Sequence, residues 1–389
     1  MIPITRPWID AREEEAVSRV LRSGWITQGP EVASFEAEFA SASGASHACA
    51  VSSCTAALHL ALLAVGVGEG DHVLTASSSF IATANAIRYC GAIPVFVDIE
   101  SGGCNLDPEK LEDSISPMTR AILCVHQMGM PCDMDAILDI ARRRGLPVVE
   151  DAACATGSAI FRGGQWEPIG RPHGEIACFS FHPRKVITTG EGGMLTTASL
   201  NHDAGLRLKR QQAMSVSDTL RHGSPEVTFE SYLALGYNYR MTDMAAAVGR
   251  VQLSRLPEIV ASRRTLAESY RTLLAGVAGL ELPHEPKWAR SNWQSFSVRL
   301  PAGVDQKRVM QRLLDRGVAS RRGIMCSHLE PAFMGTNWIA GAGGLRESEA
   351  AQRQCILLPL FPGLTEPEQQ YVAEVLKDAV TAEGRRLAS

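Results

Sequence analysis

Two polar residues follow apolar runs of this sequence, where strands of a sheet would end. Asp151 ends the strand whose apolar run is 146–149, and Lys185 comes a few residues after the run 176–181. In an open α/β sheet, ligands bind at the carboxyl ends of the strands. Lys185 has no helical periodicity around it and lies near Gly and Thr residues. We therefore expect it on a loop that reaches the same end of the sheet as Asp151.

Together these two side chains fit the chemistry of a pyridoxal-phosphate (PLP) enzyme. A carboxylate beside the pyridine nitrogen keeps that nitrogen protonated and strengthens the ring as an electron sink. A loop lysine can hold the cofactor as a Schiff base, and a nearby cation would lower its pKa and make it nucleophilic. Taken singly, Asp151 is more often a helix cap or turn residue, and Lys185 a solvated cation. Their spacing, their strand-end positions and the nearby glycines together favour a role of both residues in binding PLP.

The elements that would carry these residues form an alternating pattern over the first two thirds of the chain. Continuous apolar strands separated by helices predict a mostly parallel sheet covered on both faces. The expected strands are 48–51, 72–75, 94–98, 121–126 and 146–150, and the expected helices are 56–65 and 133–144. The runs 176–181 and 193–197 are separated only by a turn-rich segment, which predicts a local antiparallel part of the sheet.

The last third of the chain has a different pattern. It begins with a helix at 242–256 that continues through Tyr270, and after Pro283 it has an alternating strand at 293–300 and an amphipathic helix at 306–316. A capping box at Thr365 opens a final helix. Because 389 residues exceed the size at which a single core stops growing, we expect two domains. The predicted division is a large domain at 1–260, with an N-terminal substrate loop, and a small α+β domain at 261–389.

Composition excludes several classes of protein. A hydrophobic fraction of 45% and a net charge of −4 are those of a globular protein with no electrostatic attraction for nucleic acid or anionic membranes. No apolar run approaches the ~20 residues that span a bilayer, so we expect a cytoplasmic protein. The ten cysteines contain no Cys-x-x-Cys pair and are expected to be free thiols. The histidines show no ligand pair at i, i+4 spacing, so no metal is expected.

Three motifs occur in order along the chain. They are Glu150-Asp151-Ala152-Ala153, Ser180-Phe181-His182-Pro183-Arg184-Lys185 and Gly190-Glu191-Gly192-Gly193. They resemble the DegT/DnrJ/EryC1/StrS family of PLP-dependent sugar aminotransferases, which has the type I aminotransferase fold. Further matches at 23–30, 53–58, 80–86 and 236–242 extend the resemblance over nearly the whole chain. It implies a large α/β domain with a mostly parallel seven-stranded sheet between helices.

The resemblance implies roles for the cofactor-binding residues. Lys185 would form the Schiff base and then serve as general acid and base for the proton shift, and Asp151 would pair with the pyridine nitrogen. Phe80 would stack on the ring, although core packing is its alternative. Thr55 and the backbone amides of Cys54 and Thr55 would bind the phosphate at a helix N-terminus, which is compatible with a plain capping role.

Other cofactor contacts follow from the same resemblance. Ser180 resembles a second phosphate contact, and Asn238 resembles a residue that reaches the phosphate in the neighbouring subunit's site. This implies a homodimer with its sites at the subunit interface. Cys154 stands where the family usually has Gln, His or Glu to hydrogen-bond the cofactor's ring oxygen, and a thiol is a weak donor. Cys54 replaces a common Gly.

Several residues are candidates for substrate contacts because they resemble, or lie beside, family motifs. These are Trp25, Ile26, Thr27, His182, Tyr237, Arg240 and His328. Ordinary packing is the alternative for Trp25, and a helix-end or solvated histidine is the alternative for His328.

The resemblance implies an aminotransferase with small-molecule partners only. L-Glutamate or glutamine would donate the amino group to a keto-sugar, expected to be nucleotide-linked, in a ping-pong reaction. Sugar dehydratases of the family carry His in place of the lysine, so Lys185 favours transamination. The alternatives are a PLP enzyme that aminates a cyclitol or another small ketone, a PLP-dependent elimination or dehydratase enzyme, and a non-catalytic PLP-binding regulator.

Overall fold

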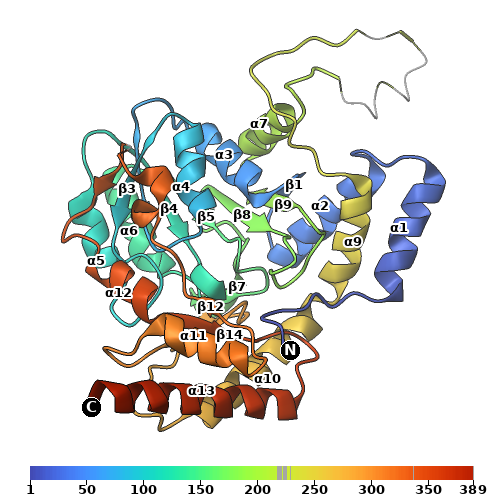
Figure 1. The fold of residues 1–389 in the computed structure, drawn as a ribbon. Helices are drawn as coiled ribbons and strands as arrows, with labels where there is room; N and C mark the ends of the chain where they lie inside the picture. Colours follow the sequence, from blue (N-terminus) through green and yellow to red (C-terminus); the bar gives the residue numbers. More distant parts are fainter. Residues whose placement is uncertain (217–220, 222–225, 228, 336, 389) are drawn as a thin grey trace.

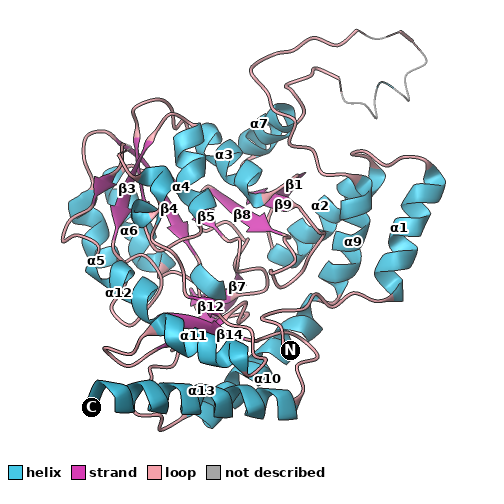
Figure 2. Cartoon of the chain, viewed as in Figure 1, coloured by secondary structure: helices cyan, strands magenta, loops and turns pink. Residues whose placement is uncertain are grey.

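The central feature of the computed structural model is a mixed sheet (Figures 1 and 2). The structure describes residues 1–216, 221, 226–227, 229–335 and 337–388, and eight strands of this part form the sheet. In spatial order they are β1 (His47–Val51), β9 (Gly193–Thr197), β8 (Ile176–Ser180), β5 (Val148–Asp151), β4 (Thr119–Val125), β2 (His72–Ala76), β3 (Ile93–Val97) and β13 (Ile339–Ala340). The six strands β8, β5, β4, β2, β3 and β13 are parallel to one another, whereas β9 is antiparallel to both its neighbours, β1 and β8. The predicted mostly parallel sheet and its antiparallel part are confirmed.

The strands are largely apolar along their length, and successive side chains point to opposite sides of the sheet. Both faces of the sheet are therefore apolar. Along β1, Ala48 and Ala50 belong to one buried cluster, and Cys49 and Val51 belong to another. The first cluster is completed by α2 (Pro30–Ser43), α5 (Pro108–Leu111), α6 (Met134–Arg144) and α9 (Asp243–Ser254). The second cluster is completed by α3 (Cys54–Ala64), α4 (Ile81–Tyr89) and α7 (Leu200–Arg210). The sheet is therefore a rigid, doubly covered base for the loops at its strand ends.

A separate core lies below the sheet in Figure 1. It surrounds a smaller antiparallel sheet in the order β11-β14-β12. Its elements are α10 (Leu256–Leu274), β11 (Phe296–Arg299), α11 (Gln306–Asp315), β12 (Arg321–Arg322), β14 (Cys355–Leu358) and α13 (Glu366–Ala388). The expected capping box is present, since Thr365 N donates to Glu368 Oε2 and Glu368 N donates to Thr365 Oγ1. The domain division at 260/261 stays a prediction.

The C-terminal part of the chain also returns to the large sheet. Strand β13 pairs with β3, so that Ile339 lies opposite Val95. Asp98, just after β3, accepts hydrogen bonds from the backbone N–H groups of Glu347 and Ser348 at the start of α12 (Arg346–Gln354). Asp98 therefore caps a helix about 250 positions away. No pattern in the sequence predicts this eighth strand.

The remaining elements are short or peripheral. They are α1 (Ala11–Ser23), η1 (Glu112–Ser114), η2 (Gln127–Gly129), β6 (Ala159–Arg162), β7 (Gln165–Pro168), β10 (Ala289–Arg290), η3 (Ser327–Leu329) and η4 (Pro331–Phe333). The continuous helix expected from 242 to 270 is two helices, α9 and α10, which meet at Arg255 with Pro257 in the first turn of α10. None of the helices in the described part has the length and apolar character needed to cross a bilayer.

The described residues between α7 and α9, called the projecting segment below, lie in part away from the body of the molecule (Figure 1). Its described residues include five exposed large apolar residues: Val227, Phe229, Tyr232, Leu233 and Leu235, of which Phe229 is 89% exposed, Tyr232 62% and Leu235 77%. Large apolar side chains gathered on one exposed segment are unusual for a surface that meets only water.

Candidate active site

A cavity of about 620 Å³ lies at the carboxyl ends of the central strands. Val125, Asp151 and Ser180 line it from β4, β5 and β8. Residues 320–325 and 357–360 close it from the side of the second core. It is thus located where open α/β sheets bind ligands. Eight predicted site residues line this cavity: Cys54, Thr55, Phe80, Asp151, Cys154, Ser180, His182 and Lys185.

Lys185 lies on the loop after β8, as expected, and its Nζ donates a hydrogen bond to Cys154 Sγ at 3.2 Å. Burial acts to lower the pKa of Lys185. The interaction with Cys154, including its hydrogen bond, followed by the effects of Cys54 and Asp151, outweighs burial and leaves the pKa above its ordinary value. The expectation that a nearby cation would lower this pKa is wrong for this structure, because acidic groups lie closest to Lys185.

Asp151 is buried at the end of β5 and faces the cavity. Its Oδ2 accepts a hydrogen bond from Thr83 Oγ1 at 2.8 Å, and its Oδ1 accepts one from Ala153 N at 3.1 Å. Burial raises the pKa of the Asp151 carboxyl, although these two hydrogen bonds act in the opposite direction. A buried carboxylate that is only partly compensated fits a cationic ring nitrogen, as PLP would provide.

The start of α3 forms another wall of the cavity. Ser53 Oγ accepts a hydrogen bond from Ala56 N and caps the helix, which leaves the Cys54 and Thr55 N–H groups at the open first turn. Such a helix start attracts anions, including phosphate. Burial raises the pKa of Cys54 well above its ordinary value, so this thiol is neutral and does not repel an anion. These residues fit the phosphate group of PLP.

Strand β9 approaches this helix start at Gly193. A Cβ atom there would lie 2.5 Å from the Ser53 carbonyl carbon and 2.7 Å from the Cys54 nitrogen. Since both are backbone atoms, no side chain could move aside to make room. Gly193, the last glycine of the third motif, is thus explained by the close packing of β9 against the predicted phosphate-binding turn.

Phe80 and Ser180 are two further predicted cofactor contacts. Phe80 immediately precedes α4, and its side chain is 54% exposed at the cavity, so the core-packing alternative is wrong for this structure. Ser180 is buried at the end of β8, and its Oγ accepts a hydrogen bond from His182 N at 3.4 Å. Their stacking and phosphate-binding roles stay predictions.

The N-terminal substrate loop lies outside the residues that line the cavity. Trp25 Nε1 donates to the Gln28 carbonyl, and a Cβ atom at Gly29 would overlap the Trp25 ring. Ile26 and Thr27 are exposed. The Asp243 carboxylate fixes the end of this loop by accepting hydrogen bonds from the backbone N–H groups of residues 29, 31 and 32.

Tyr237, Asn238 and Arg240 also do not line the cavity. Tyr237 stacks on Tyr239 with ring centroids 5.1 Å apart and packs against His59 of α3. Asn238 forms a backbone bridge with Gln211. The predicted contact of Asn238 with a neighbouring subunit's cofactor is not tested within one chain and stays a prediction.

His328 is buried beside the large sheet and does not line the cavity. Its Nδ1 lies 2.7 Å from Ser77 Oγ, and its Nε2 lies 3.5 Å from Glu349 Oε1. Burial lowers the pKa of His328. The solvated-histidine alternative is therefore wrong for this structure, and the substrate role of His328 stays a prediction.

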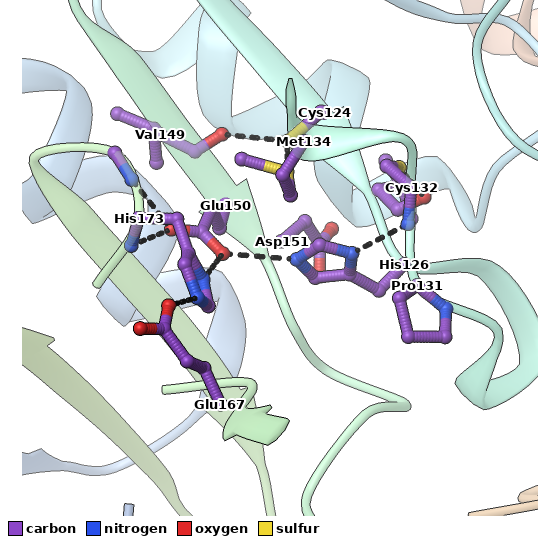
Figure 3. Close-up of polar contacts among 12 residues, drawn as sticks. Cys124, His126, Pro131, Cys132, Met134, Val149, Glu150, Asp151, Glu167 and His173 are labelled. Atoms are coloured by element: carbon purple, nitrogen blue, oxygen red, sulfur yellow. Dashed lines mark hydrogen bonds and ion pairs between the residues drawn. The ribbon is translucent and has the colours of Figure 1, made fainter. Parts of the chain in front are cut away.

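A buried polar network lies on the other side of Asp151's strand (Figure 3). His126 Nε2 lies 3.1 Å from Glu150 Oε2, and Glu150 Oε1 accepts hydrogen bonds from the backbone N–H groups of His173 and Gly174. Although burial acts to raise it, the hydrogen bonds of His126 and His173 bring the pKa of Glu150 well below its ordinary value. His126 Nδ1 accepts from Cys132 N, so its proton is on Nε2. The period-2 alternation of strands could have indicated that Glu150 and Asp151 face opposite sides.

The sequence analysis also missed residues that support the site from outside the motifs. Thr83 holds Asp151, and Gln294 Nε2 donates to the Arg184 carbonyl at 2.8 Å. Thr83 lies within the 80–86 match, one helical turn after Phe80, but no local pattern connects Gln294 to the Lys185 loop. All ten cysteines are free thiols. In the described residues, no group of three or more His, Cys, Asp or Glu side chains is arranged to hold a metal ion.

Comparison with known proteins gives consistent matches. Residues 7–377 match the model of the DegT/DnrJ/EryC1/StrS aminotransferase family. The chain is 38% identical over 379 residues to GDP-perosamine synthase of Caulobacter vibrioides, which covers 96% of this chain and 97% of that protein. It is 35% identical over 388 residues to the spore coat polysaccharide biosynthesis protein SpsC of Bacillus subtilis, which covers 97% of each. The crystal structure of an aminotransferase TlmJ from Streptoalloteichus hindustanus superposes with a TM-score of 0.88 at 33% identity, over 100% of both chains.

Proposed function

Because the chain belongs to the DegT/DnrJ/EryC1/StrS aminotransferase family, whose members depend on PLP, we propose that it transfers the amino group of L-glutamate or glutamine to a keto-sugar. The expected acceptor is a nucleotide-linked sugar, since one relative is a GDP-perosamine synthase. The observation that carries this proposal is the buried Asp151 carboxylate, which shares one cavity with Lys185 and the open start of α3.

Each of these groups has a proposed task. Lys185 would hold the cofactor covalently, Asp151 would hold its ring nitrogen in the protonated form, and the first turn of α3 would bind its phosphate. When bound, PLP supplies the electron sink that makes the proton next to the amino group labile. Once Lys185 is released, its Nζ is the cavity-lining base that would take this proton and return it.

The raised pKa of Lys185 has a consequence for its first step. An ammonium is not a nucleophile, so Lys185 must lose a proton before it can attack the cofactor's aldehyde. Cys154 Sγ, 3.2 Å from Nζ, is the nearest hydrogen-bonding partner of that ammonium. We therefore expect cofactor uptake by the apoenzyme to become faster as the pH rises.

The substrate class can be tested by following the visible absorption of the lysine-bound cofactor. The enzyme is treated with L-glutamate, the donor is removed, and keto-sugar nucleotides are added one at a time. We expect glutamate to abolish the band and one nucleotide sugar to restore it. If glutamate abolishes the band and no nucleotide sugar restores it, a cyclitol or another small ketone becomes the acceptor. If glutamate and glutamine both leave the band unchanged, transamination from these donors is excluded.

We also propose that the enzyme is a homodimer with sites at the subunit interface. Two observations support it. Phe229, Tyr232 and Leu235 are exposed apolar residues of the projecting segment. Asn238 follows on the same segment and lies outside its own chain's cavity, as a residue that serves a neighbouring site would.

A further inference from the structure

The loop 291–295 connects the second core to the predicted attachment lysine. Gln294 lines the cavity, and its Nε2 donates to the carbonyl of Arg184, the residue directly before Lys185. The same glutamine's Oε1 accepts a hydrogen bond from Ser295 Oγ, which fixes the orientation of the amide. One side of the Lys185 loop is thereby tied to a residue more than a hundred positions away.

Asn292 holds the other side of the same lysine. Its side chain is fully buried, and its Nδ2 donates to the carbonyls of Cys154 and Thr156, both at 2.8 Å. Cys154 is the residue whose Sγ accepts the hydrogen bond of Lys185 Nζ. Asn292 Oδ1 in turn accepts from Gln294 N at 2.8 Å, so the two amides act as one unit.

The backbone of this loop is strained at Trp293. Its φ angle is +51°, in the left-handed region that a bulky residue rarely adopts. The turn directs the indole into the second core, where its ring centroid lies 5.8 Å from that of Phe296. On either side of it, Asn292 contacts the carbonyls of Cys154 and Thr156, and Gln294 contacts the Lys185 loop. Strain of this kind persists only where the surrounding contacts over-determine it, and it is frequent at functional sites.

Two further residues fix the loop. Arg263 of α10 is buried, and its Nη1 donates to the carbonyls of Trp293 and Gln294, both at 3.1 Å, and to that of Leu360 at 3.2 Å. In the described part of the chain no carboxylate pairs with this guanidinium, and burial lowers its pKa to about 10. Gly129 packs against Asn292 so closely that any Cβ atom there would overlap Asn292 Oδ1.

We propose that Asn292 and Gln294 are positioning residues. They hold Cys154 and the Lys185 loop from two sides, so that Lys185 Nζ keeps its place beside Cys154 Sγ. Their amide N–H groups donate to the backbone carbonyls of Cys154, Thr156 and Arg184, so we infer that they act through the placement of Lys185 and Cys154. This proposal rests on the proposed role of Lys185 as the residue that binds the cofactor. It also links Arg263 of the second core, through the backbone of 293–294, to the carbonyl of Arg184 next to Lys185.

Several charged or titratable groups surround Lys185 and set the background for a test by pH. Cys154 and Asp151 face it from the end of β5, and Cys54 faces it from the start of α3. His182 and Arg184 lie on its own loop, with Arg321 of the second core close to both. A substitution at 292 or 294 replaces none of these groups, so a change in the titration of Lys185 would report a change in its placement relative to them.

The test replaces Gln294 by Met, which keeps the volume and removes the amide donor. The matched control is Gln369→Met, since Gln369 is also buried and its Nε2 donates to one backbone carbonyl, that of Leu266, within the second core. Both holoenzymes are titrated by the visible absorption of the lysine-bound cofactor, and kcat and the KM for the donor are measured. We expect Gln294→Met to shift the titration midpoint by about half a pH unit or more and to lower kcat roughly tenfold, with little change in KM. Gln369→Met should lower the melting temperature alone.

Two further variants make the result decisive. Gln294→His retains a ring N–H and should titrate closer to the wild type than Gln294→Met does. Lys185→Ala tests the premise, because it should lack the lysine-bound band altogether. An unshifted midpoint in Gln294→Met, or equal shifts in Gln294→Met and Gln369→Met, would overturn the positioning role. A band that persists in Lys185→Ala would instead overturn the proposed role of Lys185.

Discussion

Asp151 lowers the free energy of unfolding of the apoenzyme at neutral pH and has a proposed catalytic role. Burial raises the pKa of this carboxyl, so the folded apoenzyme binds its proton more tightly than the unfolded chain does. Its contribution to the free energy of unfolding is therefore unfavourable at neutral pH, and the deficit develops as the pH rises above 3.8, the usual pKa of an aspartate. A cationic ring nitrogen beside the carboxylate would remove this deficit, so cofactor binding and folding are linked through one residue.

This linkage predicts opposite effects of Asp151→Asn in the two forms of the enzyme. The apoenzyme should melt a few degrees higher than the wild type at pH 8, and the gain should shrink as the pH approaches 3.8. Transaminase activity should fall by roughly two orders of magnitude or more, because a neutral amide cannot stabilise a protonated ring nitrogen. Thermal melts of the apoenzymes across pH, with the holoenzyme rates, check both. A destabilised apoenzyme variant at pH 8 would contradict the argument.

Among single residues, the sequence pattern located Asp151 and Lys185 because both follow continuous apolar strands. Cys54, Thr55, Phe80, Cys154 and Ser180 were added by resemblance to a family. Residues that act through hydrogen bonds between distant segments left no such signal. Gln294 lies within a run expected to be a strand from 293 to 300, but the structure begins β11 at Phe296, because Trp293 turns into the left-handed region. The hydrophobic periodicity of the sequence gives no indication of that turn.

The pair of elements β9 and α3 shows how secondary structure shapes the site. Gly193 lets the strand come within contact distance of the Ser53–Cys54 peptide, and this peptide begins the helix that is proposed to bind phosphate. The strand is buried along its whole length, so it cannot retreat without disturbing β1 and β8. The position of the helix start is thus determined by the absence of one side chain.

Gly193→Ala should therefore weaken both folding and cofactor binding. We expect a loss of about 1–3 kcal/mol in the free energy of unfolding, typical of overpacking, together with weaker PLP binding. Gly205→Ala in α7 is the matched control, because a Cβ atom there would meet nothing within 4 Å. It should be neutral or stabilising by up to about 1 kcal/mol. Denaturant unfolding and PLP titration of both variants provide the comparison, and equal behaviour of the two would refute the packing argument.

Strands and helices were predictable to the extent that they are long and periodic. The runs at 48–51, 72–75 and 121–126 gave strands β1, β2 and β4 with ends shifted by one or two residues. β13 has two residues, which is too short for any alternation to be visible, and its place in the sheet depends on pairing with a distant strand. Tertiary contact therefore decides such an element, whereas local pattern decides the others.

Considered as an assembly, the chain exposes more apolar surface on its projecting segment than a monomer needs. Phe229, Tyr232 and Leu235 lie between α7 and α9, close in sequence to Asn238. In the proposed homodimer, a second copy of the chain would cover these side chains, and Asn238 is expected to reach the neighbouring cavity. Cofactor binding and association would then depend on each other.

The predicted consequence is that association can be weakened from this segment alone. We expect the wild type to sediment as a dimer at micromolar concentration, and Phe229→Glu to raise the dissociation constant by about tenfold or more. Leu314→Glu, at a half-exposed leucine on α11, should leave the dimer intact. Analytical ultracentrifugation with and without PLP measures both effects. A wild-type monomer that retains full activity would rule out the shared site.

The late return of the chain to β3 has a consequence for synthesis on the ribosome. Strand β3 is complete by Val97, yet its outer neighbour β13 begins at Ile339. At ordinary rates of translation, that interval lasts on the order of tens of seconds. During this time the outer edge of the nascent sheet presents unpaired N–H and C=O groups, which other chains can pair with. The nascent polypeptide is therefore exposed to aggregation at this edge until β13 (Ile339–Ala340) has been made, and a chaperone would benefit it at this stage.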